Sequence, residues 1–349
     1  MNADGATLLI RADAGPRIGT GHVMRTLALA QAWQDAGGRA SFVTAADSPA
    51  IRTRLEADGF SVVRVDAPIG SPDDVLQTIS VAREQGARWI VLDGYRFTSD
   101  AQKAIKQAGF PLLWIDDNGD AAYYYADVVL NQNLCAEASH YSAREPYTQL
   151  LLGTEYVMLR REFLKWRGWT RPTPPVAQRV LLTLGGSDPD NLTLRLVEAM
   201  QHIAVDGLEA ILVIGPSNNN GKSLNAAARA STFPIHVETN PANMPELMAW
   251  ADVAISGAGT TCWELAFLGL PNLLIVLAEN QRRTAECLAD RGVSWLLPAG
   301  LSPALPEIGG MVRGFLRDSQ RRTIMSCNGR ALIDGQGAAR VVEKLRAIS

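Results

Sequence analysis

Cysteine is scarce in this sequence, which has four cysteines among 349 residues and no Cys-x-x-Cys pair. This spacing fits neither a zinc-binding motif nor a disulfide-exchange motif, and a chain of this length does not depend on disulfides to hold its core together. The four histidines also lack the spacing of metal ligands. We therefore expect no metal and no other cofactor, and the low cysteine content favours a cytoplasmic protein.

Long apolar runs and clusters of basic residues are absent as well. No segment approaches the roughly 18 apolar residues of a membrane-spanning helix, and the apolar run near the N-terminus is too short and lacks the basic flank of a signal peptide. The formal net charge is -3, and the positive charges are scattered. Nucleic acid and stable membrane insertion are therefore not expected. We expect a cytoplasmic monomer whose ligand is a small molecule.

The sequence does contain a regular alternation of short β-branched or apolar runs with longer helical patterns. Such alternation predicts a parallel sheet covered by helices on both faces. Residues 22–38 are typical of the helical pattern, with apolar side chains every three or four positions and a closing Gly-Gly pair. Strands are expected at residues 7–14, 40–46, 61–67, 89–95 and 111–117.

This alternation breaks at WRGWTRPTPPV, residues 166–176, where three prolines fit neither a helix interior nor a central strand. We interpret the segment as an interdomain linker, because the length of the chain also favours two domains. The predicted fold is α/β, with two doubly wound Rossmann-like domains, 1–165 and 176–349, that face a cleft. After the linker, strands are expected at residues 179–186, 208–215, 234–240, 252–259, 272–278 and 293–300, with a helix from Asp190.

The stretch ISGAGTTCWELAFLGLP, residues 255–271, combines a strand end, a glycine-rich turn and a helix start. Glycines allow a ligand to approach the backbone, either threonine of the turn fits the helix N-cap, and free amides at a helix start hold phosphate oxygens. Glu264 is placed to accept hydrogen bonds from a ribose diol. The candidate nucleotide-binding residues are Ser256, Gly257, Gly259, Thr260, Thr261 and Glu264.

The same stretch also has a purely structural interpretation. The helix dipole favours a glutamate in the first turn whatever the ligand. The turn lacks a complete Gly-x-Gly-x-x-Gly motif and a Gly-x-x-x-x-Gly-Lys-[Ser/Thr] motif, which disfavours dinucleotide and P-loop sites. From spacing alone, a nucleotide site and a structural turn both remain open.

A second glycine-marked turn lies in RADAGPRIGTGHVMR, residues 11–25, and places His22 between a predicted strand and a helix. Imidazole titrates near neutral pH and can take a proton from water, and the positive end of a helix dipole disfavours its charged form. A lone histidine in a turn is more often a surface or capping residue. The glycines on both sides of Thr20 and the strand-end position make a catalytic base an equal alternative.

Other charged residues at strand ends are weaker candidates. Arg11 and Asp13 lie on one face of the first strand, so we expect them to pair with each other rather than to contact a substrate. Asp93 and Asp116 follow predicted strands and are either cleft carboxylates or loop caps.

Together, RADAGPRIGTGHVMRTLALA, SGAGTTCWELAFLGLP with the later AENQ, and the stretches LDGYRF, DVVLNQN, LLGTEYVMLRREF and LTLGGSDPDN resemble the PseG family. Its members are UDP-sugar hydrolases of pseudaminic acid biosynthesis and are shaped like the B-type glycosyltransferases (GT-B), which include MurG. The resemblance extends over nearly the whole chain. The opening motif is fairly specific for this group, whereas many B-type transferases share the C-terminal turn.

The resemblance implies that UDP lies mostly on the C-terminal half and that the sugar faces the N-terminal half. It implies hydrolysis of UDP-2,4-diacetamido-2,4,6-trideoxy-β-L-altropyranose to UDP and the free sugar by attack of water at the anomeric carbon. His22 is then the general base, and Tyr95 and Asn280 orient the water or the sugar. The further substrate-binding residues are Gly19, Thr20, Gly21, Gly185, Gly186, Ser187 and Gln281.

Alternatives remain for the residues and for the function. Tyr95 is also suited to pack over a strand end, Asn280 to cap the next helix, and Asp188 with Pro189 to start one. A glycosyltransferase of the same fold, as suspected for similar spore-coat polysaccharide proteins, would use His22 to deprotonate an acceptor hydroxyl. A nucleotide-sugar binding protein without turnover would need no base.

Overall fold

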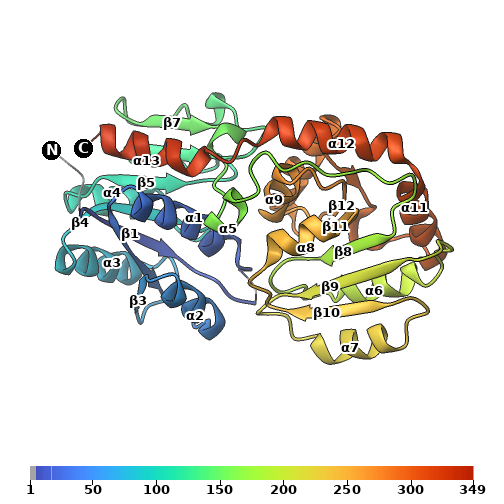
Figure 1. Ribbon diagram of the computed structural model, residues 1–349. Helices are drawn as coiled ribbons and strands as arrows, with labels where there is room; N and C mark the ends of the chain where they lie inside the picture. The colour runs from blue at the N-terminus through green and yellow to red at the C-terminus, as the bar shows by residue number, and fades with distance from the viewer. Residues whose placement is uncertain (1–4, 17, 349) are drawn as a thin grey trace. The chain divides into compact units, whose positions relative to one another are not determined.

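The structure is a computed structural model that describes residues 5–16 and 18–348. The chain divides into two compact units, of which the first comprises Met1–Arg161 with Gly335–Ser349 and the second Glu162–Asp334. Each unit has a parallel sheet flanked by helices (Figure 1). The predicted α/β class with two doubly wound domains is confirmed. None of the helices in the described ranges is long and apolar enough to cross a membrane.

The first unit is built on a parallel sheet with the strand order β3-β2-β1-β4-β5-β6-β7. All six residues of β1 are buried, because Leu8 and Ile10 pack into one hydrophobic cluster while Leu9 packs into another on the opposite face. The strands are β1 (Thr7–Ala12), β2 (Arg39–Thr44), β3 (Ser61–Arg64), β4 (Ala87–Asp93), β5 (Leu112–Ile115), β6 (Val128–Asn131) and β7 (Gln149–Leu152).

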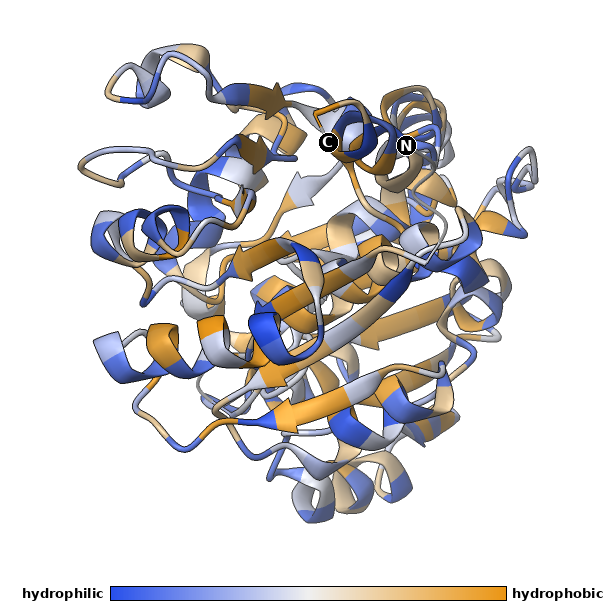
Figure 2. Ribbon diagram, turned by 90° about the vertical axis from the view of Figure 1, so that its left-hand side faces the viewer, coloured by the Kyte–Doolittle hydropathy of each residue, from blue (hydrophilic) through white to orange (hydrophobic). Residues whose placement is uncertain are grey.

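Helices cover both faces of this sheet. Leu27 of α1 and Val341 of α13 belong to the cluster on one face, and Ile79 of α3 and Ile105 of α4 belong to the other. The strands in Figure 2 are accordingly mostly hydrophobic, whereas the helices also carry hydrophilic residues. The helices of this unit are α1 (Gly21–Asp35), α2 (Pro49–Ala57), α3 (Pro72–Glu84), α4 (Ser99–Gln107) and α13 (Gly337–Ala347).

The second unit repeats the plan with a parallel sheet in the order β10-β9-β8-β11-β12-β13. The strands are β8 (Arg179–Thr183), β9 (Glu209–Ile214), β10 (Ile235–Thr239), β11 (Val253–Gly257), β12 (Asn272–Ile275) and β13 (Trp295–Leu296). The helices are α6 (Leu192–Met200), α7 (Gly221–Arg229), α8 (Met244–Trp250), α9 (Thr261–Phe267), α10 (Arg282–Asp290), α11 (Leu305–Arg317) and α12 (Ser319–Leu332). The short helix α5 (Arg161–Leu164) lies where the chain passes from one unit to the other.

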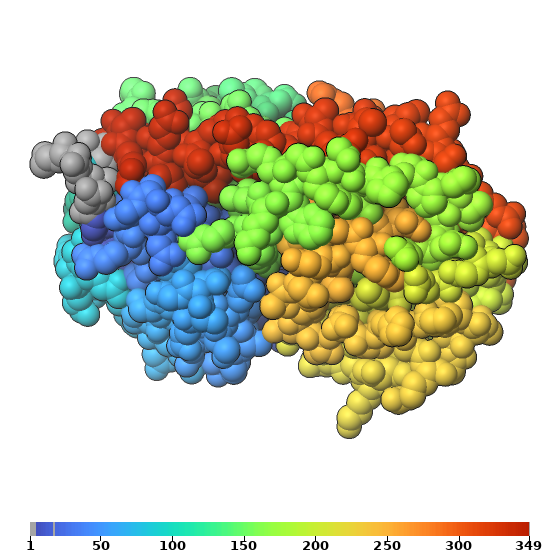
Figure 3. All heavy atoms as spheres, viewed as in Figure 1, coloured from blue at the N-terminus to red at the C-terminus, as the bar shows by residue number. Residues whose placement is uncertain are grey.

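The observed units differ from the predicted limits in two ways. Residues 335–349 lie in the first unit rather than the second, because α13 buries its apolar face against α1. The segment 166–176 lies within the second unit, and Figure 3 shows it in light green on the surface beside α12, in red. There Arg322 of α12 donates hydrogen bonds to the carbonyl groups of Pro174 and Pro175, and Arg171 donates to the carbonyl of Ala251.

Each predicted strand is present, with bounds shifted by a few residues, but β6 and β7 are additional to the prediction. In both sheets the strand order reverses between two adjacent strands that are far apart in sequence, β1 and β4 in the first unit and β8 and β11 in the second. Ligands of doubly wound sheets bind outside the carboxyl ends of the strands at such a reversal. The two glycine-marked motifs follow β1 and β11, so they lie at these points.

Candidate active site

His22 is held at the start of α1 by the loop that follows β1. Gly15 and Gly19 exchange backbone hydrogen bonds of 3.1 and 2.8 Å, and Gly19 has a φ of 77°, which favours glycine. The chain then turns through Thr20, the N-cap residue, into the helix. His22 is only 6% exposed, which excludes the alternative of a surface histidine.

The imidazole contacts the end of β4, the neighbour of β1 across the strand-order reversal. The Nδ1 atom of His22 lies 2.6 Å from Oδ1 of Asp93, the last residue of β4. Arg25, one turn further along α1, donates to both carboxylate oxygens of Asp93 at 2.7 Å. Burial would raise the pKa of Asp93, but Arg25 and then His22 outweigh this and lower it. Asp93 is thus a buried carboxylate that is kept ionised.

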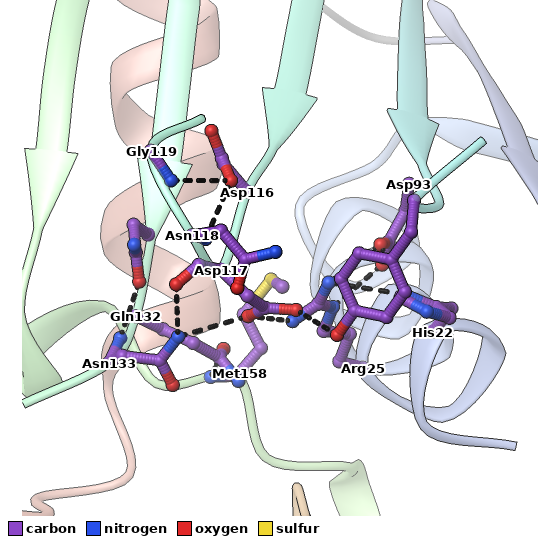
Figure 4. A network of polar contacts seen from close by, with 12 residues as sticks. His22, Arg25, Asp93, Asp116, Asp117, Asn118, Gly119, Gln132, Asn133 and Met158 are labelled. Carbon is purple, nitrogen blue, oxygen red and sulfur yellow. Dashed lines mark hydrogen bonds and ion pairs between the residues drawn. The ribbon is translucent and has the colours of Figure 1, made fainter. Parts of the chain in front are cut away.

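A second carboxylate extends this network towards β5 and β6. Arg25 Nη1 donates to Asp117 Oδ1 at 2.7 Å, and Asn133 Nδ2 donates to the same oxygen at 3.1 Å. Burial opposes the charge of Asp117, yet Arg25 holds its pKa well below the usual range. Figure 4 shows this chain of contacts from His22 through Arg25 to Asp117 and Asn133. Side chains from α1, the end of β4 and the loops after β5 and β6 therefore meet at the carboxyl edge of one sheet.

Tyr95 joins the network two residues after β4. Its hydroxyl donates to Oδ2 of Asp117 at 2.8 Å, and its ring meets the His22 ring edge to face with centroids 4.7 Å apart. The side chain of Tyr95 is 54% exposed. The structure therefore brings together His22 and Tyr95, as the resemblance implied, and adds Arg25, Asp117 and Asn133, which the sequence interpretation missed.

Two other candidate carboxylates have structural roles. Asp116 accepts hydrogen bonds from the backbone amides of Asn118 and Gly119 and from the Tyr124 hydroxyl, so it caps a loop. Arg11 contacts Asp13 at 2.6 Å, which confirms the predicted pair. Arg11 also donates to Asp74 of α3, and all three of these side chains are buried.

In the second unit, Gly185 and Gly186 form a turn directly after β8. The end of β9 approaches this turn so closely that a Cβ atom on Gly215 would lie 2.4 Å from the carbonyl oxygen of Gly185. Ser187 follows in the same turn. Asp188 accepts hydrogen bonds from the amides of Leu192 and Thr193 and so starts α6, whereas Pro189 lies before the helix and not in its first turn.

The segment 217–223, polar in sequence, is tied to this turn. The Ser217 amide donates to the carbonyl oxygen of Gly186 at 3.0 Å, and the Asn220 side chain donates to that of Asp188 at 3.0 Å. Hydrogen bonds therefore join the loops after β8 and β9 to each other at the carboxyl edge of the second sheet.

The predicted nucleotide motif lies at the end of β11, beside this turn. β11 includes Ser256 and ends at Gly257, within the predicted range 252–259, and Thr260 is the N-cap residue of α9. Thr260 thus occupies the predicted N-cap position, although its side chain makes no capping hydrogen bond with a described residue. A Cβ atom on Gly259 would lie 3.6 Å from Nε2 of Gln281.

The remaining candidates of the second unit lie close by in sequence. Glu264 is half-buried one turn into α9. Asn280 is exposed in a 3-10 helix, Glu279–Gln281, and the N-cap residue of α10 is Gln281, so Asn280 is not that helix's cap. Gln281 accepts a hydrogen bond from the Leu277 amide. The described residues hold no group of three or more His, Cys, Asp or Glu side chains placed to bind a metal ion.

The sequence is similar to several known proteins. Residues 180–301 match the glycosyltransferase family 28 C-terminal domain. An uncharacterized protein of Methanocaldococcus jannaschii is 29% identical over 81% of this chain, which spans 57% of that protein's length. The UDP-2,4-diacetamido-2,4,6-trideoxy-beta-L-altropyranose hydrolase of Campylobacter jejuni is 25% identical over 82% of this chain and 97% of its own. The spore coat polysaccharide biosynthesis protein SpsG of Bacillus subtilis is 25% identical over 97% of both chains.

Solved structures agree with the topology described above. MurG of Acinetobacter baumannii has a TM-score of 0.67 and 18% identity, and the alignment covers 98% of this chain and 99% of MurG. Anabaena HepE in complex with UDP-glucose has a TM-score of 0.63 and 18% identity, with coverage of 98% and 100%. The chain thus has the GT-B fold of MurG, matches the glycosyltransferase family 28 C-terminal domain over residues 180–301, and is similar over most of its length to a UDP-sugar hydrolase of the PseG type.

Proposed function

We propose that this protein hydrolyses UDP-2,4-diacetamido-2,4,6-trideoxy-β-L-altropyranose to UDP and the free sugar, as a step of pseudaminic acid biosynthesis. The observation that carries the proposal is the buried pair of His22 and Asp93 at the carboxyl edge of the first sheet. The name of the Campylobacter jejuni relative supplies the substrate. We further propose that the enzyme acts as a cytoplasmic monomer and needs neither a metal nor another cofactor.

His22 is the base in this mechanism. Its Nδ1 atom is bound to Asp93, so Nε2 is the ring nitrogen that takes a proton from the attacking water. The water oxygen bonds to the anomeric carbon, the bond from that carbon to the diphosphate oxygen breaks, and its electron pair leaves with UDP. The imidazolium that results lies against an ionised carboxylate, which stabilises it.

The charges around His22 suit this proton transfer. While the imidazole is neutral, the net charge of the cluster is that of one carboxylate, because Arg25 balances one of its two partners Asp93 and Asp117. When His22 accepts the proton, the cluster becomes neutral. Arg25 meanwhile prevents Asp93 from taking the proton itself, because it lowers the pKa of that carboxyl group.

We assign UDP to the second unit. The backbone amides of Gly259, Thr260 and Thr261 donate no hydrogen bond to a backbone carbonyl of the loops and turns in the described part of the chain, and such groups stabilise the charge that develops on a leaving diphosphate. The turn of Gly185, Gly186 and Ser187 lies at the same edge of the sheet. Glu264 is assigned to the ribose hydroxyls, and Asn280 with Gln281 to the sugar or the water.

A glycosyltransferase is the second candidate. It is favoured by the match to the family 28 domain and by the similarity to SpsG. In that reaction His22 would deprotonate an acceptor hydroxyl in place of water, and the rest of the site would serve unchanged. The two functions therefore differ in the nucleophile alone.

A proton and phosphorus NMR time course separates these functions. Purified protein is mixed with the UDP-sugar and EDTA, and no acceptor is added. Release of UDP with an equal amount of free sugar supports the hydrolase. Binding without release contradicts the hydrolase for this substrate and leaves the transferase or a binding protein.

A further inference from the structure

The two carboxylate oxygens of Asp117 accept hydrogen bonds from different partners. Oδ1 accepts hydrogen bonds from Arg25 Nη1 at 2.7 Å and from Asn133 Nδ2 at 3.1 Å. Oδ2 accepts the hydroxyl proton of Tyr95 at 2.8 Å. The Arg25 guanidinium and the Asn133 amide nitrogen can only donate hydrogen bonds. The atom of residue 117 that faces them must therefore be an acceptor.

This arrangement fixes the direction of the Tyr95 hydroxyl. A phenol has one proton, and here Asp117 accepts it. Partial burial and the nearby Asp117 charge raise the pKa of Tyr95, so the phenol stays protonated at neutral pH. Any other group that meets this oxygen must therefore do so as a hydrogen-bond donor.

The Tyr95 side chain is also well placed for the reaction. The Tyr95 side chain is 54% exposed, and its ring lies edge to face with His22 at a centroid separation of 4.7 Å. On the proposed function, the groups that come to His22 are the attacking water and the sugar. Both carry hydrogen-bond donors, the first as O–H and the second as acetamido N–H or hydroxyl O–H.

We propose that the Tyr95 hydroxyl is an acceptor subsite that recognises a hydrogen-bond donor of the bound reactants, and that Asp117 is the positioning residue that sets this polarity. The inference rests on the proposed function, since it takes the water and the sugar from there. It assigns Tyr95 a defined role, acceptance of a hydrogen bond, rather than general orientation of the substrate.

The substitution Asp117→Asn tests the polarity directly. Arg25 and Asn133 require an oxygen opposite them, so the new amide must place its Oδ1 there and turn its Nδ2 towards Tyr95. The Nδ2 group then donates to the phenol oxygen, and the hydroxyl proton points towards the reactants. The Tyr95 hydroxyl would then point its proton at a donor group of the reactants. This contact would be repulsive, so the hydroxyl would slow the reaction or weaken substrate binding.

The experiment compares wild type, Tyr95→Phe, Asp117→Asn and the double variant by kcat, KM and the dissociation constant of the UDP-sugar. Tyr147→Phe, which removes another half-exposed hydroxyl of the same unit, is the matched control. Thermal unfolding checks that each variant is folded. We expect Tyr95→Phe to lose about three- to tenfold in kcat/KM and Asp117→Asn to lose more. Removal of the hydroxyl in the Asp117→Asn background should then restore at least about threefold.

This reversal of sign distinguishes the proposal from a loss of charge or structure at Asp117, which predicts no gain in the double variant. A change confined to kcat identifies the water as the donor, and a change in the dissociation constant identifies the sugar. A double variant no better than Asp117→Asn overturns the proposal. So does a Tyr95→Phe variant that matches wild type in every constant. If the wild type binds the UDP-sugar without hydrolysing it, the proposed function is wrong, but the inference can still be tested by binding. Equal dissociation constants in all four proteins would then overturn the inference.

Discussion

Nδ1 of His22 and Oδ1 of Asp93 lie 2.6 Å apart although 71 positions separate them in the sequence. Two adjacent parallel strands make this contact possible, because β1 leads into the helix that carries His22 and β4 ends at Asp93. One consequence is that the histidine is buried and oriented before any ligand arrives. Its role can therefore be tested by substitutions that leave the fold intact.

Replacement of His22 by alanine should remove most of the turnover and keep UDP binding. The loss of a general base costs about 100- to 10,000-fold in rate, whereas UDP is assigned to the second unit. The measurement is the hydrolysis rate together with the dissociation constant of UDP, with His236→Ala on the exposed strand β10 as the control. Near-normal turnover of the variant would remove His22 from the mechanism. Loss of UDP binding would show that its role is structural.

Replacement of Asp93 by asparagine should also slow the reaction, by about 100-fold or more. The amide keeps the shape of the carboxylate but cannot stabilise the imidazolium, and it leaves Arg25 without its bidentate partner. We expect kcat to fall with little change in the dissociation constant of UDP. A variant that retains wild-type kcat would show that the charge of Asp93 has no role in catalysis.

Acid should destabilise the protein partly through the same network. Burial opposes the charges of Asp93 and Asp117, but Arg25 holds the pKa of each below its usual value. A lowered folded-state pKa stabilises the fold above the unfolded-state pKa of about 3.9, and this stabilisation is lost as the pH falls towards the folded-state value. Urea unfolding at pH 7, 5, 4 and 3 measures the effect.

The Asp117→Asn variant is the reference for that measurement. We expect it to be less stable than wild type by about 3 kcal/mol at pH 7, since it weakens a buried ion pair. The difference should shrink below about pH 4, because this carboxyl group then begins to take up its proton in the unfolded wild-type chain, while in the folded protein Arg25 still keeps it ionised. A constant difference over the whole pH range would mean that the charge of Asp117 does not contribute.

How far the sequence predicted this structure differs between fold and site. The strands were predictable because continuous apolar runs such as that of β1 are typical of strands buried on both faces. The short strands β6 and β7 were not, because no α-helix lies among the described residues between β5, β6 and β7, so the alternation of strands and helices that marks the other strands is missing there. A helical pattern such as that of α13 shows an apolar face but does not say which sheet it covers.

The site was predictable in its motifs and not in its contacts. His22 was marked by the glycines around it, and Arg25 follows on the same helix face in the same quoted stretch. Nothing local connects either residue with Asp93 or Asp117, because the sheet order brings these together. The strand-end positions of the two aspartates were the available signal, and loop capping explains such positions equally well, as Asp116 shows.

In the second unit, Gly215 allows the end of β9 to approach the turn of Gly185 and Gly186. In Gly215→Ala the new Cβ atom would lie 2.4 Å from the carbonyl oxygen of Gly185 and 2.6 Å from Cα of Gly186, so the backbone of the turn must move. We expect a loss of about 1–3 kcal/mol in stability. We also expect UDP to bind at least about tenfold more weakly, because the turn is assigned to the diphosphate side.

Gly221→Ala is the matched control for this substitution, since the closest atom to its new Cβ would be Cδ1 of Ile214 at 4.0 Å. Calorimetric titration with UDP and thermal unfolding are run on both variants. If Gly215→Ala is destabilised yet binds UDP like wild type, the turn after β8 is not part of the nucleotide site. If both measurements change in Gly215→Ala and neither changes in the control, the close approach of β9 is what shapes that site.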